Sequence, residues 1–137
     1  MKRIIVTGAN KGIGLGIVRR LLSEYDETFL ILAARSLERA EKSASLLLDE
    51  NKAWKNRLIT LKLDVELDDS VAEASEKIHS VFDGISEPIH CLINNAGVGD
   101  SYLSMQRVLD VNTWGVKRVC EAFLPLISKK QGRIVNV

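Results

Sequence analysis

The stretch Thr7-Gly8-Ala9-Asn10-Lys11-Gly12-Ile13-Gly14 decides the fold of this chain. It follows a short apolar run, Arg3–Thr7, and leads into a helical pattern over Leu15–Leu22. The first glycine permits a tight strand-to-helix turn, the second lets the backbone approach a pyrophosphate, and the third allows the helix to pack closely. The helix N-terminus offers free N–H groups to such an anion. In this context the turn predicts a dinucleotide-binding βαβ unit rather than a glycine-rich turn without a ligand.

Short apolar runs alternate with helical patterns along the chain. The five candidate strands are Arg3–Thr7, Phe29–Ala34, Arg57–Leu63, Ile89–Asn94 and Arg133–Val137. They are almost continuously apolar, as expected where helices cover both faces of a parallel sheet. The alternation predicts an α/β fold, a doubly wound parallel sheet joined by right-handed crossovers. The chain ends inside the fifth strand pattern, and we expect a single domain over residues 1–137.

Helical periodicity predicts which side chains face the sheet. Apolar residues recur at three-to-four spacing in four sets: Ile13, Ile17 and Leu21; Leu37, Ala40, Ala44 and Leu47; Val71, Ala74, Ile78 and Val81; and Val108, Val111, Gly115, Val119, Ala122, Phe123 and Leu126. Each set lies on one face of an α-helix. Pro88 is expected in a loop before the fourth strand, and Pro125 is expected to kink or end the last helix.

Composition and charge argue against several classes of partner. The net charge of +1 provides no field for nucleic acid or anionic lipid. No apolar run is long enough to span a membrane, and the N-terminal run is too short for a signal peptide. The two cysteines, Cys91 and Cys120, have no metal-ligand spacing to each other or to histidine. We therefore expect two buried reduced thiols rather than a disulfide or a metal site, and a cytoplasmic location.

The end of the second predicted strand carries the coenzyme signal. In a dinucleotide fold, an acidic residue there binds the 2′-hydroxyl of the adenosine ribose, whereas an arginine suits a 2′-phosphate. This chain has Arg35, and the next acidic residue is Glu38. Lys11 and Arg39 could add positive charge to the same phosphate, and a guanidinium can donate to it in parallel pairs. The sequence favours NADP(H) over NAD(H), against the alternative that Arg35 is a solvated residue at a helix start.

Five motifs in order resemble the short-chain dehydrogenases/reductases. They are Thr7-Gly8-x-x-x-Gly12-x-Gly14, Leu63-Asp64-Val65, Asn94-Asn95-Ala96-Gly97, Val111-Asn112-Thr113-Trp114-Gly115 and Gly132–Val137. The resemblance implies a Rossmann-type sheet of strand order 3-2-1-4-5, truncated after the fifth strand, in a domain that is incomplete at its C-terminus. Asn10–Leu15, Ala34-Arg35 and Leu124–Ile127 are most similar to NADPH-dependent carbonyl reductases.

The resemblance also implies roles for individual residues. Asp64 and Val65 would contact the adenine, while Asn94, Ala96 and Gly97 would steady the sheet and line the nicotinamide side. Asn112 would be the asparagine of the catalytic tetrad, which positions a water in the proton relay. The implied activity is NADP(H)-dependent reduction of a small-molecule carbonyl to an alcohol by hydride transfer. The family's usual dimer face uses the helix around Val108–Ser128 together with a following helix that this sequence does not include. A homo-oligomer is therefore possible, and the oligomeric state stays open.

The chain departs from the family pattern at the proton donor. The family uses a Tyr-x-x-x-Lys motif, but here Tyr25 is followed four residues on by Phe29, and Tyr102 by Gln106. The family serine would follow Val137, so Asn112 is the one tetrad member present. A non-catalytic NADP(H)-binding sensor or scaffold is therefore the alternative function. A third reading, an isomerase or epimerase of the extended branch, is disfavoured because by resemblance that branch has a different glycine spacing.

Two further expectations concern the carboxyl half of the chain. Fourteen residues separate Gly97 from Asn112, fewer than the family pattern leads us to expect, so Val98–Gln106 supports no inference about the substrate. The fifth strand is expected to form an exposed apolar edge, and such edges favour association with other chains. We therefore expect the 137-residue chain to self-associate.

Overall fold

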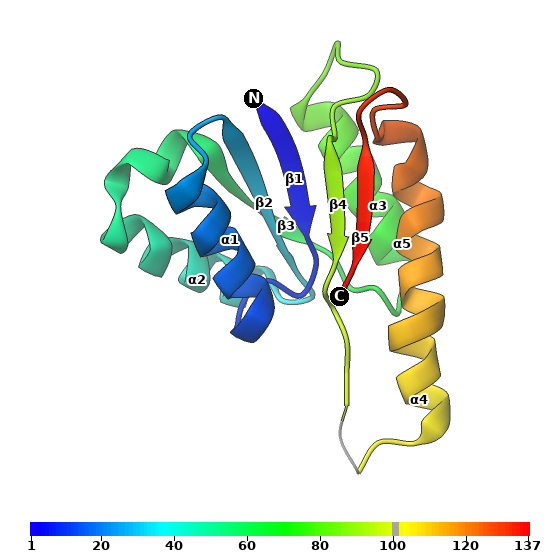
Figure 1. Cartoon of the computed structure of the whole chain (residues 1–137). Coiled ribbons are helices and arrows are strands. Elements are labelled where there is room, and N and C mark those ends of the chain that lie inside the picture. The colour runs from blue at the N-terminus through cyan, green and yellow to red at the C-terminus, as the bar shows by residue number, and fades with distance from the viewer. Residues whose placement is uncertain (100–101) are drawn as a thin grey trace.

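The computed structural model describes residues 1–99 and 102–137. It contains a five-stranded parallel sheet in the order β3-β2-β1-β4-β5, shown in Figure 1. The strands are β1 (Lys2–Val6), β2 (Thr28–Ala34), β3 (Leu58–Lys62), β4 (Cys91–Asn94) and β5 (Arg133–Asn136). The predicted doubly wound fold and its strand order are confirmed, with strand ends that differ by one or two residues from those predicted.

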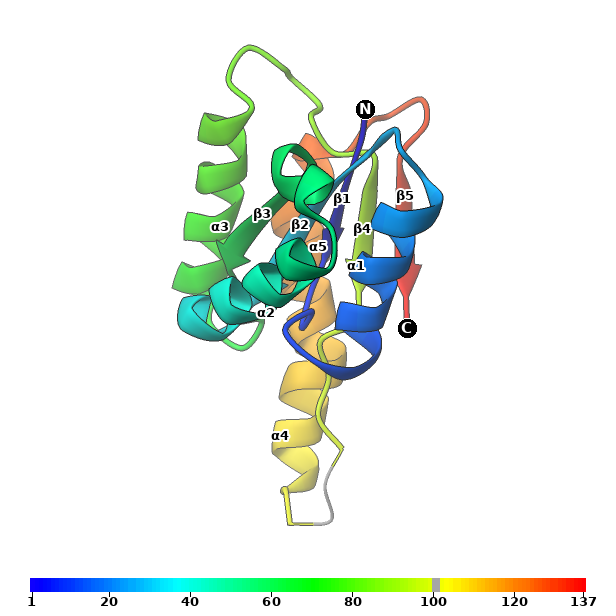
Figure 2. The same cartoon turned by 90° about the vertical axis from the view of Figure 1, so that its left-hand side faces the viewer.

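Helices cover both faces of the sheet. One face carries α1 (Gly12–Glu24) and α2 (Leu37–Glu50), and the other carries α3 (Asp68–Val81) and α5 (Val116–Phe123), as the side view in Figure 2 also shows. The short helix α4 (Met105–Leu109) projects past the carboxyl ends of the strands (Figure 1). Three short helical segments complete the described chain: η1 (Lys52–Arg57), η2 (Asp110–Gly115) and η3 (Leu124–Leu126).

Two apolar layers hold the helices on the sheet. On β1, Ile5 packs with the α3 and α5 side, whereas its neighbour Val6 packs with the α1 and α2 side. Successive strand residues point to opposite faces, so a strand covered on both sides must be apolar throughout. Phe123 of α5 and Leu22 of α1 are fully buried, one in each layer. This packing fixes the strands whose carboxyl ends form the site.

The buried face of α1 differs from the predicted one. The sequence pattern placed Ile13, Ile17 and Leu21 against the sheet. Ile17 and Leu21 are half-buried and pack against the α1 and α2 layer, but the fully buried positions are one residue later, at Gly14, Val18 and Leu22. Ile13 is 70% exposed. Apolar residues occupy consecutive positions in this helix, so periodicity could not separate the two faces. Gly14 decides between them, because its missing side chain lets α1 approach the backbone of Gly8.

The sequence predicted one continuous helix over the last helical pattern, but the structure does not have one. The helix is interrupted between α4 and α5 by a π-helical turn, Asp110–Gly115, which contains Asn112. Single π turns inside helices frequently occur at functional sites. The prediction for Pro125 is confirmed, since α5 ends at Phe123 and a 3₁₀ turn follows. Leu37 and Val81, predicted to be buried, lie exposed at the ends of their helices, where the sheet no longer covers them.

Strand β5 forms one edge of the sheet, and its residues are exposed. Val135 pairs with Ile93 of β4, whose side chain packs in the α1 layer, and Val135 is 44% exposed. A lysine on an edge strand opposes edge-to-edge pairing with a second chain. We predict that the 137-residue chain associates at high concentration and that Val135→Lys shifts it toward monomer in sedimentation velocity. Identical sedimentation of the two proteins would contradict this prediction.

No helix in the part of the chain that the structure describes is long and apolar enough to cross a membrane. The same residues contain no group of three or more metal-ligating side chains.

Candidate functional site

A cleft of about 390 Å³ lies at the carboxyl ends of β1, β3 and β4. In an open α/β sheet this is the edge where ligands bind, at the point where neighbouring strands lead to opposite faces. Ten of the residues predicted from the sequence line the cleft: Gly8, Asn10, Lys11, Gly12, Ile13, Arg35, Asp64, Val65, Ala96 and Gly97. The fold thus brings together residues from four separate segments of the chain.

The remaining predicted residues lie elsewhere. Gly14 lies behind the turn in contact with Asn95 and Gly8, and Arg39 is an exposed residue of α2 that does not line the cleft. Asn94 and Asn112 line a neighbouring cavity. Sequence reasoning did not single out several other cleft residues: Leu63, Glu66, Asn95, Val98 and Val111. Leu63, Asn95 and Val111 stand inside motifs of the family pattern, and that position is the signal that could have found them.

The glycine turn leaves the N-terminus of α1 open toward the cleft. Gly8 and Gly12 have φ values of 60° and 56°, which other L-residues rarely adopt. A Cβ atom on Gly8 would lie 2.8 Å from Cα of Ala96. The N-cap residue of α1, Lys11, makes no side-chain capping bond, whereas Ser36 of α2 caps the N–H of Arg39. The uncapped N–H groups of α1 can therefore donate to a phosphate.

Thr7 joins the glycine turn to the end of β4. Its hydroxyl Oγ1 accepts hydrogen bonds from the backbone N–H groups of Asn95 and Ala96, each at 3.0 Å. The side chain of Asn95 links the same two segments in the opposite direction, because its Nδ2 donates to the carbonyl oxygens of Thr7 at 3.0 Å and Gly8 at 3.2 Å. Thr7 is 1% exposed. These bonds fix the two walls of the cleft relative to each other.

Thr7→Val keeps the shape of this side chain and removes its hydroxyl. We predict a loss of about 2 kcal/mol in the free energy of unfolding, because two partly buried backbone N–H groups lose their partner. Urea unfolding measures the change. Thr60→Val on β3 is the matched control, since no described residue hydrogen-bonds its hydroxyl. Equal losses in the two variants would contradict the role of Thr7.

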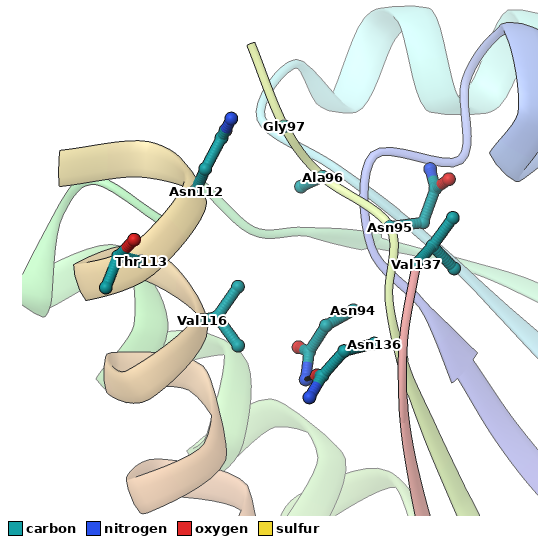
Figure 3. A pocket seen from close by; sticks show the side chains of 9 residues that line it. All are labelled: Asn94, Asn95, Ala96, Gly97, Asn112, Thr113, Val116, Asn136 and Val137. Carbon is teal, nitrogen blue, oxygen red and sulfur yellow. Dashed lines mark hydrogen bonds between the residues drawn. The ribbon is translucent and has the colours of Figure 1, made fainter. Parts of the chain in front are cut away.

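The neighbouring cavity, of about 350 Å³, lies between the ends of β4 and β5 and the start of α5 (Figure 3). Asn94 and Asn136 face each other across the two strands, and Nδ2 of Asn94 donates to Oδ1 of Asn136 at 2.9 Å. The same Nδ2 lies 3.3 Å from Sγ of Cys120. Asn94 is thus a buried link between two strands and a helix.

Asn112 on the π turn is held by the backbone of Val98. Its Oδ1 accepts from the Val98 N–H and its Nδ2 donates to the Val98 carbonyl, both at 2.8 Å. One lone pair of Oδ1 and one N–H of Nδ2 remain for other partners. The side chain therefore bridges the π turn η2 and the segment after β4, and the positioning of a water by Asn112 stays a prediction. Asp100 and Ser101, within the short segment Val98–Gln106, lie outside the described residues.

Shifted pKa values occur at the opposite, amino end of the sheet. Burial lowers the pKa of His90, and the nearby Arg3 lowers it further. The ring atom Nδ1 of His90 accepts from the N–H of Arg3 at 3.1 Å, as a neutral imidazole can. Burial raises the pKa of the Cys91 thiol. Cys91 and Cys120 are free thiols. The sequence predicted that both are buried, but they are only half-buried, and Cys91 borders a cavity next to exposed β5.

Known proteins resemble the chain throughout its length. A family model described as short chain dehydrogenase matches residues 2–137. Mitochondrial D-beta-hydroxybutyrate dehydrogenase of Bos taurus is 34% identical over 99% of this chain and 40% of its own length. Carbonyl reductase [NADPH] 1 of Mus musculus is 31% identical over 97% of this chain and 47% of its own length.

Solved structures agree with this match. An alcohol dehydrogenase from the archaeon Thermococcus sibiricus, complexed with 5-hydroxy-NADP, has a TM-score of 0.80 and 33% identity, over 99% of this chain and 57% of that one. The NADPH-bound carbonyl reductase from chicken fatty liver has a TM-score of 0.78 and 25% identity, over 98% and 57%. The chain spans about half the length of these proteins. The match over nearly every residue, on the same fold, places the chain in the short chain dehydrogenase family.

Proposed function

We propose that this chain is the cofactor-binding part of an NADP(H)-dependent oxidoreductase that reduces a small-molecule carbonyl to an alcohol. The observation that carries the proposal is the cleft, where the uncapped N-terminus of α1, the open glycine turn and Arg35 meet. The cleft residues fit a dinucleotide phosphate, because the N–H groups of α1 are uncapped and Lys11 and Arg35 bring positive charge to the same cleft. When bound, NADPH supplies a hydride from its nicotinamide ring.

The residues of the chain divide the binding task. The N–H groups of α1 would bind the pyrophosphate, and Arg35 with Lys11 would bind the 2′-phosphate. The carboxylate of Asp64 would accept a hydrogen bond from the adenine amino group, with Val65 beside it. Ala96 and Gly97, at the start of the segment after β4, would border the nicotinamide end. Asn112, on the π turn, would act near the substrate carbonyl.

A second function is supported by the sequence itself. Neither Tyr25 nor Tyr102 has a lysine four residues later, so neither resembles the family's proton donor. Hydride transfer to a carbonyl also needs a proton, and an unperturbed tyrosine with a pKa near 10 is poorly matched to neutral pH. The alternative is a module that binds NADP(H) for sensing or scaffolding without turnover.

Two measurements separate these functions, and both use the native protein purified from its source, because the 137-residue cofactor-binding part is expected to be inactive alone. The first is the Kd of NADPH by fluorescence titration, and the second is NADPH oxidation in the presence of a panel of aldehydes and ketones. Binding with carbonyl-dependent oxidation supports the reductase. Binding without oxidation of NADPH by any carbonyl supports the sensor or scaffold. A protein that does not bind NADPH contradicts both. Homo-oligomerisation and a cytoplasmic location stay predictions.

A further inference from the structure

One wall of the cleft is fastened to α5 by a single arginine. The β3–α3 turn, residues 63–67, contributes Leu63 through Glu66 to the cleft. Arg118 of α5 reaches this turn from behind: its Nη1 donates to the carbonyl oxygen of Val65 at 2.6 Å. Its Nε donates to Oδ1 of Asp68, the first residue of α3. The guanidinium therefore fixes the turn and the start of α3 together.

Two neighbouring contacts also hold the β3–α3 turn, and they come from α4 and η2, the helical segments that precede α5. A Cβ atom on Gly115 would lie 2.9 Å from Cγ2 and 3.2 Å from the carbonyl oxygen of Val65, so the helix backbone packs directly against that residue. Arg107 of α4 lies 3.5 Å from Oε1 of Glu66 in an ion pair. Of these groups, Arg118 is the one that bonds to the turn's backbone.

The bond to Val65 also orients Asp64. The peptide group between residues 65 and 66 is held at both ends, because its carbonyl accepts from Arg118 and its N–H donates to Oδ1 of Asp64 at 3.0 Å. The N–H of Asp64 itself donates to Oγ of Ser70 at 2.8 Å. Among the described residues, none hydrogen-bonds the second carboxylate oxygen, Oδ2. That oxygen is free to accept a hydrogen bond from a ligand in the cleft.

We infer that Arg118 is a positioning residue for recognition of the adenine amino group. It holds the 65–66 peptide, the peptide holds one oxygen of Asp64, and the other oxygen is thereby presented to the cleft. This inference rests on the proposed function, because it takes the ligand to be NADP(H). Arg118 itself does not line the cleft. Its effect is therefore expected on discrimination between bases and not on binding of the phosphates.

The test compares two dinucleotides that differ at one group. NADPH carries the adenine amino group, and reduced nicotinamide hypoxanthine dinucleotide phosphate carries a carbonyl oxygen in its place, which cannot donate to Asp64. We expect wild-type protein to bind NADPH roughly tenfold more tightly, the ratio that one lost hydrogen bond to a charged group produces. In Arg118→Met this ratio of Kd values is expected to fall close to one. In Arg118→Lys, which keeps the charge and part of the donation, it is expected to be intermediate.

The matched control is Lys117→Ala, at the residue before Arg118 on α5. Lys117 pairs with Glu121 on the same helix, so its loss should leave the ratio at the wild-type value. A general loss of stability weakens both dinucleotides equally and leaves the ratio unchanged. An unchanged ratio in both Arg118 variants, or a wild-type ratio near one, overturns the inference while NADPH binding still supports the proposed cofactor. A wild-type protein that binds neither dinucleotide overturns the proposed cofactor, and the inference with it.

Discussion

Gly14→Ala is expected to weaken NADPH binding by roughly 100-fold or more and to lower the free energy of unfolding by about 1–3 kcal/mol, the usual cost of overpacking. The added Cβ would lie 2.7 Å from the carbonyl oxygen of Gly8 and 2.9 Å from Cα of Ala9, and closer still to the side-chain amide of Asn95. Asn95 cannot move aside without losing its bonds to Thr7 and Gly8. The strain therefore falls on the glycine turn that would bind the pyrophosphate.

Fluorescence titration with NADPH and urea unfolding measure the two effects. Gly16→Ala is the matched control, because it lies on the same helix and a Cβ there meets nothing within 4 Å. Alanine is the better helix former by up to about 1 kcal/mol, so Gly16→Ala should stabilise the protein and leave the Kd unchanged. If Gly14→Ala bound NADPH as tightly as Gly16→Ala, the close approach of α1 to the turn would not matter for binding.

Arg35→Ala is expected to raise the Kd of NADPH by roughly 100-fold and to leave the Kd of NADH nearly unchanged, since charged hydrogen bonds to a phosphate are strong. Arg35 follows β2 directly and lines the cleft. No described residue forms an ion pair or hydrogen bond with its guanidinium, so the loss should act on the ligand and not on the fold.

Arg39→Ala provides the comparison for Arg35. Arg39 is also an exposed arginine, four residues further along, but it does not line the cleft. The Kd of Arg39→Ala for NADPH should stay within about twofold of wild type, since Arg39 does not line the cleft. Equal losses in the two variants would show that both arginines bind the 2′-phosphate, as the sequence predicted. An equal loss of NADH binding in Arg35→Ala would show that Arg35 does not distinguish the coenzymes.

The fold could be predicted because its determinants are local. The glycine turn requires a strand before it and a helix after it, and the alternating apolar runs supply the rest of the sheet. The buried face of α1 could not be predicted from periodicity, because Ile17 and Val18 are both apolar and the choice depends on how closely Gly14 approaches Gly8 and Asn95, of which Asn95 is distant in the sequence. The π turn was hidden for a related reason, since it contains Asn112, which bonds to Val98 fourteen residues away.

The candidate site could be predicted where a motif touches the ligand cleft, and less well where a residue acts through another. Arg35 and Asp64 line the cleft as expected. Arg118 was not singled out, because its role depends on a carbonyl more than fifty residues earlier in the chain. The charge of Arg39 also points to the cofactor, but its place on α2 leaves it off the cleft wall, and Arg39→Ala tests whether it contributes to binding.

The two hydrogen bonds between Asn112 and Val98 have a consequence for how such proteins diversify. They join the two ends of the connection between β4 and α5, so that residues 99–111 form a closed loop. The entropy of closing a loop grows only with the logarithm of its length, by about 0.6 kcal/mol for each doubling. Residues can therefore be inserted or deleted between Val98 and Asn112 while Asn112 keeps its place. Related proteins can therefore differ in the length of this connection and still share the geometry around Asn112.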